Sequence, residues 1–145
     1  MPIDMQSAIV AEVIARLAVV EIFGVRVFED SVMRVLDAAD ESLPDYFIVI
    51  QPGSTEEVER QAHLSVRERM TLNITAVTKV RGFAPLLRAA RWGIKSALPG
   101  VKGGISVQGV QTVSFQPETP LPPAEGHRWA AHVMPIQITY VQPLK

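Results

Sequence analysis

The sequence contains no cysteine. A protein made from it therefore has no disulfide, no thiolate metal site and no cysteine nucleophile, and nothing requires an oxidising compartment. Long apolar runs are missing too. Near the N-terminus, where such a run could act as an export signal or a membrane span, Asp4, Glu12 and Arg16 interrupt the apolar positions. We therefore expect synthesis in the cytoplasm and no membrane partner.

An excess of one charge sign is also absent, because the net charge is only −1. This disfavours a nucleic-acid partner, since affinity for a duplex comes largely from neutralising phosphates. The charges are nevertheless distributed unevenly along the chain. Residues 21–59 contain ten acidic side chains and two arginines, whereas residues 79–102 contain six basic side chains and no acidic one. The two segments therefore have opposite signs.

Sequence motifs of catalytic or metal sites are missing as well. The three histidines lack the i, i+4 spacing of zinc-binding helices; they are His63, His127 and His132. The glycines of residues 100–104 follow an expected helix, whereas a phosphate-binding loop precedes one. No Gly-x-Ser-x-Gly elbow is present. We expect a non-enzymatic protein without metal or cofactor, although His127 and His132 leave a metal site open as the weaker alternative.

The pattern of apolar residues predicts one α+β domain over residues 1–145, a common length for a domain. Apolar residues recur at helical spacing in three segments, residues 7–20, 31–39 and 86–98. Alternating or β-branched runs predict strands at residues 25–28, 46–50, 70–76, 105–115 and 129–141. This order favours a mostly antiparallel or mixed sheet of about four strands, with two or three helices packed on one face.

Prolines and polar residues predict two long loops. Pro52 and Gly53 should end the strand before them, so residues 52–66 are expected to be an acidic loop. Residues 116–128 are rich in proline and should form a stiff, exposed loop. Pro135 falls inside the last strand, which predicts that this strand is bent or lies at an edge of the sheet.

The basic segment includes a cationic ridge on its helix. Arg88, Arg91 and Lys95 follow i, i+3, i+7 spacing, partly opposite the apolar stripe. We hypothesise that this basic surface contacts the acidic surface of a neighbouring copy, because head-to-tail contacts of this kind close into rings. The alternative is an ordinary solvated helix face.

The combination of elements resembles the tail terminator, or tail completion, family of long-tailed bacteriophages. The resemblance covers nearly the whole chain and is based on the order and pattern of its elements: the N-terminal helix, the strands Leu43 to Ile50 and Met70 to Ile74, the helix Leu86 to Leu98 and the strand Trp129 to Tyr140. It implies a subunit of a ring, commonly a hexamer, that stops growth of the tail tube and joins it to the head. A related neck or head-tail joining protein is the alternative.

That resemblance implies a virion protein, assembled in the bacterial host cytoplasm, whose partners are other copies of itself, the tail-tube protein and a head-completion or neck protein. The two loops are the expected docking segments, because loops on a rigid scaffold often have binding functions. Their candidate contact residues are Glu56, Glu57 and Glu59 in the first loop and Glu125, His127, Arg128 and Trp129 in the second. Core packing is an equal alternative for Trp129. A small ligand-binding module is the alternative from a different class.

Overall fold

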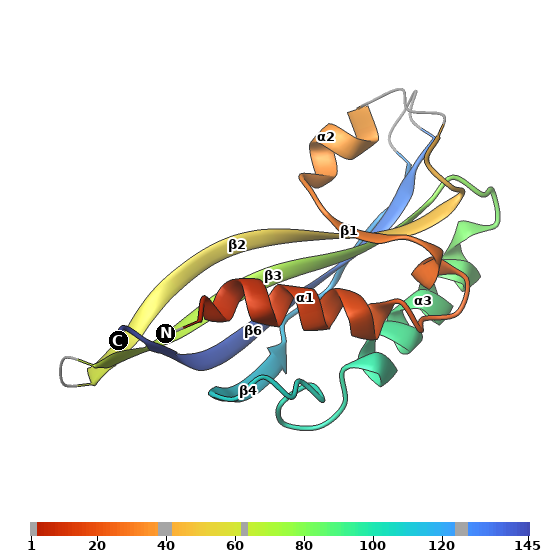
Figure 1. Ribbon diagram of the computed structural model, residues 1–145. Coiled ribbons are helices and arrows are strands. Elements are labelled where there is room, and N and C mark those ends of the chain that lie inside the picture. Colours follow the sequence, from red (N-terminus) through yellow and green to blue (C-terminus); the bar gives the residue numbers. More distant parts are fainter. Residues whose placement is uncertain (1–2, 38–41, 62–63, 124–127) are drawn as a thin grey trace.

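The computed structural model describes residues 3–37, 42–61, 64–123 and 128–145. Its fold is α+β, as the sequence predicts, with a mixed sheet of six strands in these residues where about four were expected. The strands are β1 (Val27–Glu29), β2 (Tyr46–Gln61), β3 (Ser65–Thr78), β4 (Val110–Phe115), β5 (Thr119–Leu121) and β6 (Ala130–Pro143). The helices are α1 (Met5–Leu17), the short 3-10 helix η1 (Phe23–Val25), α2 (Val32–Asp37) and α3 (Phe83–Ala97). Figure 1 shows the long strands β2, β3 and β6 crossing the molecule.

The sheet has the strand order β1-β2-β3-β6-β4, and β5 pairs with β6 beyond the end of β4. The β1 strand runs parallel to β2, and the other pairs are antiparallel. The β2–β3 and β3–β6 ladders are long, because β3 and β6 pair over their full lengths. Figure 1 shows that these strands curve together around α1.

Two helices cover one face of the sheet. The α1 helix begins after Asp4, whose carboxylate accepts hydrogen bonds from the backbone N–H groups of Gln6 and Ser7. Its buried side is continuous with that of α3 and with alternate residues of β2, β3 and β6, among them Ile48, Ile74 and Ile136. Alternation along a strand sends every second side chain to the same face, so this face holds the main core.

The packing of α1 and α3 on one face confirms the prediction of two or three helices there, and the short α2 helix packs on the opposite face. Val35 of α2 lies against Phe47 and Val49, whose neighbours Ile48 and Ile50 belong to the main core. Both faces of this part of β2 are buried, which explains its continuous apolar sequence. None of the described helices is long and apolar enough to span a membrane.

The predicted acidic loop at residues 52–66 is wrong. The β2 strand continues through Pro52 and Gly53 to Gln61, and β3 begins at Ser65. We call Gln51–Gln61 and Ser65–Met70 the outer hairpin. Proline is tolerated because this part of β2 lies at the edge of the sheet, where a missing N–H breaks no ladder on the outer side. Register shifts between Pro52 and Thr55 and between Glu57 and Glu59 absorb the extra residues as β-bulges.

The predictions for the last two strands and the proline-rich loop also need correction. Of the two alternatives predicted for β6, a bend or an edge position, the structure excludes the edge position: β3 pairs with it on one side, and β4 and β5 pair with it on the other. The carbonyl of Pro135 accepts a hydrogen bond from the Gln116 backbone N–H, so its ring nitrogen faces the gap between β4 and β5, where no ladder needs a donor. The loop predicted at residues 116–128 includes exposed strand β5, and the strand predicted from residue 105 begins only at Val110.

Candidate functional site

The described residues contain no group of three or more histidine, aspartate or glutamate side chains placed to hold a metal ion. His63 and His127 lie outside the described residues. His132 is mostly buried, and its Nε2 lies 2.8 Å from a carboxylate oxygen of Glu118. The candidate sites are therefore surfaces that could contact other proteins.

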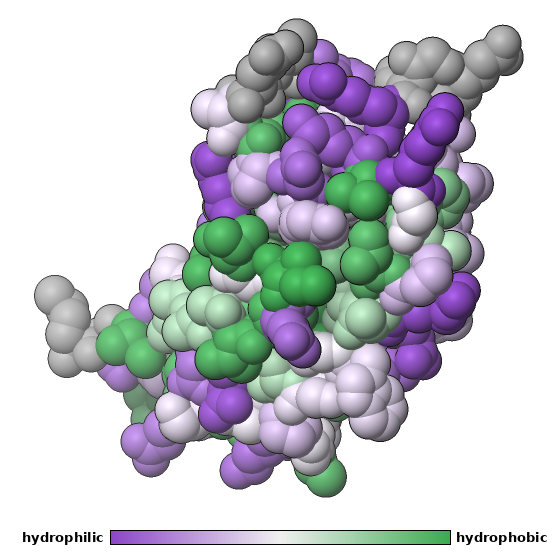
Figure 2. Space-filling view, turned by 90° about the vertical axis from the view of Figure 1, so that its right-hand side faces the viewer, coloured by the Kyte–Doolittle hydropathy of each residue, from purple (hydrophilic) through white to green (hydrophobic). Residues whose placement is uncertain are grey.

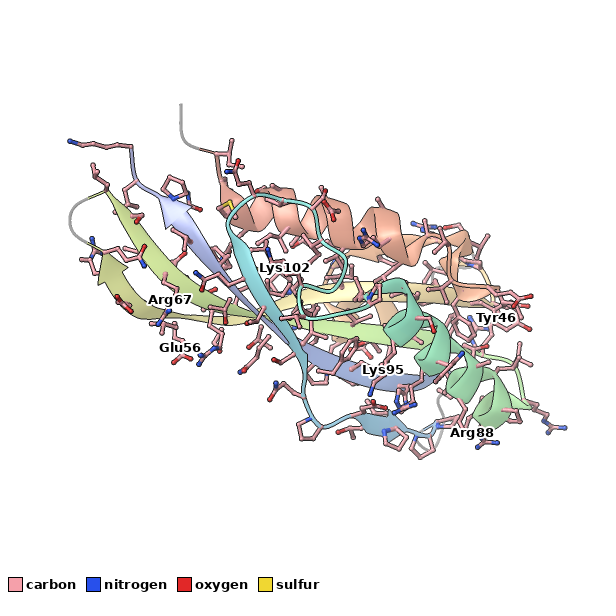
Figure 3. The ribbon with its side chains drawn as sticks, turned by 90° about the horizontal axis from the view of Figure 1, so that it is seen from below. Tyr46, Glu56, Arg67, Arg88, Lys95 and Lys102 are labelled. Atoms are coloured by element: carbon pink, nitrogen blue, oxygen red, sulfur yellow. The ribbon has the colours of Figure 1, made fainter. Side chains whose placement is uncertain are left out.

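The three glutamates of β2 in the outer hairpin are paired with arginines of the same subunit. Ion pairs join Glu56 to Arg69 at 2.8 Å, Glu59 to Arg67 at 3.1 Å and Glu57 to Arg60 at 2.9 Å. The first two pairs cross from β2 to β3, where partner residues face each other on one side of the sheet. Figure 3 shows Glu56 and Arg67 on the same stretch of hairpin, away from α3. The acidic residues therefore form a mixed-charge ladder in place of the expected acidic loop.

The cationic ridge of α3 is also partly neutralised. Arg91 and Lys95 both form ion pairs with Glu118, which lies just before β5 and is only 16% exposed in its side chain. Burial alone would raise the pKa of Glu118, but hydrogen bonds from Arg91, His132 and Lys95 outweigh it and lower the pKa to about 2. We call these four residues the Glu118 cluster. The ion pairs of this cluster join the proline-rich segment to α3.

Arg88 differs from the two other ridge residues because it is exposed and makes no ion pair with the described residues. In Figure 3 it lies at the outer end of α3, whereas Lys95 lies over the sheet. Contact between the acidic and basic surfaces of neighbouring subunits stays a prediction, with few unpaired charges to drive it. Of the candidate residues in these two surfaces, Arg88 is the one without an ion pair to any described residue.

The second group of candidate residues is only partly described, since Glu125 and His127 lie outside the described residues. Arg128 lies over the ring of Trp129 at 5.9 Å from its centroid. Trp129 is 8% exposed and packs edge-to-face on Phe47, with ring centroids 5.2 Å apart. Its ring belongs to the core under α2, so it offers little surface to a partner.

Exposed apolar side chains that the sequence interpretation missed lie on two elements. Val19, Ile22 and Val25 lie in the segment after α1, and Trp92 lies on α3. Val19 is 77% exposed and Trp92 is 70% exposed. Figure 2 shows hydrophobic side chains gathered on the side of the molecule that faces right in Figure 1. The sequence signal that could have identified the exposed Trp92 is its position on α3. Trp92 follows Arg88 by four residues, opposite the buried Leu87, Ala90 and Ile94.

The backbone is strained at Ile22, in the segment after α1. Ile22 has φ 70° and ψ −62°, and the Phe23 backbone N–H donates a 2.8 Å hydrogen bond to the Glu21 carbonyl. These values define a γ-turn of the rare, strained form, and a β-branched residue is unusual at a positive φ. The turn buries Phe23 and leaves Ile22 half exposed. Strain of this kind persists where the surrounding structure holds it in place, and it concentrates at functional sites.

An apolar groove of about 230 Å³ lies between α2 and β5 on the other face of the sheet. We call it the α2 groove; its lining residues are Met33, Leu36, Asp37, Leu121, Pro122, Trp129 and Ala131. Met33 is exposed, and Asp37 at the rim makes no ion pair with the described residues. The groove therefore combines apolar walls with the carboxylate of Asp37, which is unpaired as far as the described residues go.

No family model and no curated protein matches the sequence. Among solved structures, a chain from the "Virion of native gene transfer agent (GTA) particle" has a similar fold, with a TM-score of 0.57 and 16% sequence identity. The match covers 94% of this chain and 90% of that chain. The similarity therefore extends over the whole domain, and at this identity it shows a shared fold.

Proposed function

We propose that this chain is a non-enzymatic structural subunit of a phage-like virion. The supporting observation is the similarity of its fold, over nearly the full lengths of both chains, to a chain of a gene transfer agent virion. The apolar groove between α2 and β5 agrees with a subunit that binds other proteins, because apolar grooves on a surface often mark interaction sites.

Within the virion, we propose that the chain is a tail terminator that forms a ring, a hexamer by analogy with the family it resembles. Such a ring would sit at the head-proximal end of the tail, stop growth of the tail tube and present a surface to a head-completion or neck protein. The outer hairpin projects away from the body of the domain and is the element best placed to reach a neighbour or the tube (Figure 1).

Native mass spectrometry and negative-stain microscopy of the purified chain test ring formation. We expect particles of one diameter and a mass that is a whole multiple of the subunit mass. Because five of the six candidate charges of the two surfaces, all except Arg88, are already paired inside the subunit, the ring should persist near 1 M salt, where the screening length is only about 3 Å. A monomer at all protein and salt concentrations would contradict the proposal.

A neck protein, the alternative within the virion, differs in its binding partner. A tail terminator binds the tail-tube protein, whereas a head-tail joining protein binds the connector at the vertex of the head. Pull-down of purified tube protein and purified connector by the tagged chain separates the two roles. Retention of the tube protein supports the terminator, and retention of the connector alone supports the neck protein.

A ligand-binding module remains the alternative from another class, and one groove favours it. A mostly apolar groove of about 440 Å³ lies between the start of α3 and β5, with Phe83, Leu87, Leu121 and His132 among its lining residues. Grooves of this size and character hold small ligands in other proteins. A small molecule retained through purification and seen by native mass spectrometry would favour this function over the virion proposal.

A further inference from the structure

All the sulfur of this chain is in methionine, since the sequence has five methionines and no cysteine. With no thiol to react first, a peroxide that oxidises sulfur in this protein must attack a thioether. Met1 lies outside the described residues. Met5, Met70 and Met134 are at most 2% exposed. Met33 is 65% exposed, so access to an oxidant in solution separates it from the three buried methionines.

The short α2 helix fixes the direction of the Met33 side chain. The backbone N–H of Val32 donates a 2.9 Å hydrogen bond to the side chain of Gln51, which ties the start of α2 to β2. Val35 is buried on the face of the sheet opposite α1. Residues two apart in a helix point to opposite sides, so Met33 faces away from this buried contact. It shares a side of the helix with Asp37, four residues later, and both line the α2 groove.

From this placement we propose that Met33 is a site of selective and reversible oxidation by hydrogen peroxide. The thioether sulfur attacks one peroxide oxygen, so that an S–O bond forms and the O–O bond breaks. The second oxygen takes the proton of the first and leaves as water. Sulfur is oxidised by two electrons and the peroxide is reduced by two. The inference goes beyond the proposed function, because it requires an exposed thioether and no binding partner.

Oxidation of Met33 changes the chemical character of the α2 groove. Met33 supplies the one sulfur atom among the groove's described lining residues, whose other walls are mostly apolar. A sulfoxide converts the flexible apolar side chain into a polar one with a strong acceptor oxygen. Covering that oxygen with an apolar group costs free energy, because the oxygen would lose its hydrogen bonds to water. The affinity of the groove for apolar groups therefore depends on the redox state of Met33.

A time course of oxidation tests the selectivity. The full-length chain is treated with hydrogen peroxide, and each methionine is followed by peptide mapping with mass spectrometry. We expect Met33 to react at least about tenfold faster than Met5, Met70 and Met134, although Met5 and Met70 also line grooves, because walls cover their side chains. In concentrated urea the four rates should converge, since burial causes the difference. A buried methionine that reacts as fast as Met33 in the folded chain overturns the proposal.

Reversibility is tested on the oxidised, folded chain. Methionine sulfoxide is reduced by two enzymes, one for each epimer at sulfur. Both enzymes together should return Met33 to the thioether, because its exposure in the folded chain lets them reach it. A sulfoxide that both enzymes leave in place until urea is added would show that the folded protein hides it. That result overturns the proposal of a reversible site.

Trp129 reports the change in the groove, since it lines the groove together with Met33. Trp92→Phe leaves Trp129 as the single tryptophan of the chain. In this background, peroxide should shift the Trp129 emission to longer wavelength, and Met33→Gln should shift it in the same direction without oxidation. Met33→Leu is the matched control, because leucine has a similar volume and no sulfur. An equal response to peroxide in the Met33→Leu control overturns the proposed effect on the groove. Urea midpoints should stay the same in all variants, since Met33 is exposed.

Discussion

Removal of the Glu118 carboxylate should destabilise the fold in a pH-dependent way. Glu118→Gln keeps the shape of the side chain but removes the charge that Arg91, Lys95 and His132 contact. The folded pKa is about 2, against an ordinary value of 4.5. One pKa unit corresponds to about 1.4 kcal/mol, so the ionised carboxylate is favoured in the folded state by roughly 3 kcal/mol.

The cost expected for Glu118→Gln at pH 7 is about 1–3 kcal/mol, because Arg91 and Lys95 are partly exposed and solvent screens their contribution. The sign of the pH effect follows from the lowered pKa. The contribution is complete above about pH 4.5, the unfolded value, and is lost as pH falls towards the folded value of about 2. The difference between wild type and variant should therefore shrink over this interval.

Urea unfolding followed by tryptophan fluorescence at pH 7, 5 and 3 measures this difference. Glu56→Gln is the matched control, since its pair with Arg69 is more exposed and should contribute less than about 1 kcal/mol. The reasoning is refuted if the two variants cost the same free energy at pH 7, or if the cost of Glu118→Gln stays constant down to pH 3.

Two further substitutions probe the ends of α1. Gly24→Ala should lower the free energy of unfolding by about 1–3 kcal/mol in urea titration, because the new Cβ would meet the Ala18 carbonyl at 2.5 Å; an unchanged midpoint would contradict this. Tyr140→Phe removes a hydroxyl that accepts from Gln6 and donates to Glu68, so the stability at pH 7 should fall by about 1 kcal/mol. Amide exchange at the start of α1 should then quicken, and an equal loss in a Gln6→Ala background would argue against the contact.

Elements whose pattern is local were predictable from the sequence. The α1 and α3 helices and the β3 and β6 strands follow apolar periods that one face of each element then buries. The extension of β2 beyond Pro52 was not predictable in this way. Its stability depends on pairing with β3 and on ion pairs such as Glu56 to Arg69, which join residues distant in the sequence. The internal position of the strand that contains Pro135 was unpredictable for the same reason, since the gap that Pro135 faces depends on where β4 ends.

The same distinction between local patterns and tertiary contacts applies to the candidate contact residues. Opposite charge runs are visible in the sequence, but the position of Glu118 against Arg91 and Lys95 is a tertiary feature. Neutralisation of the ridge therefore could not be read from the helix alone. Trp92 was identifiable, because it falls opposite the apolar stripe of α3. A large aromatic side chain on the solvent side of a well-formed amphipathic helix is a more informative signal than a run of charges.

The edges of the sheet bear on how such a subunit could assemble. Beyond Ile50 the outer side of β2 has no strand partner, yet it contains Pro52, two bulges and a series of glutamates, all of which oppose the addition of another strand. At the other edge, the Val101 carbonyl accepts the hydrogen bond of the Val113 N–H in β4. Growth by strand pairing is thus opposed at the β2 edge, and at Val113 the β4 edge already has a backbone partner. Contacts between side-chain surfaces can instead close a ring, as a protein that ends a polymer requires, which supports the proposed terminator function.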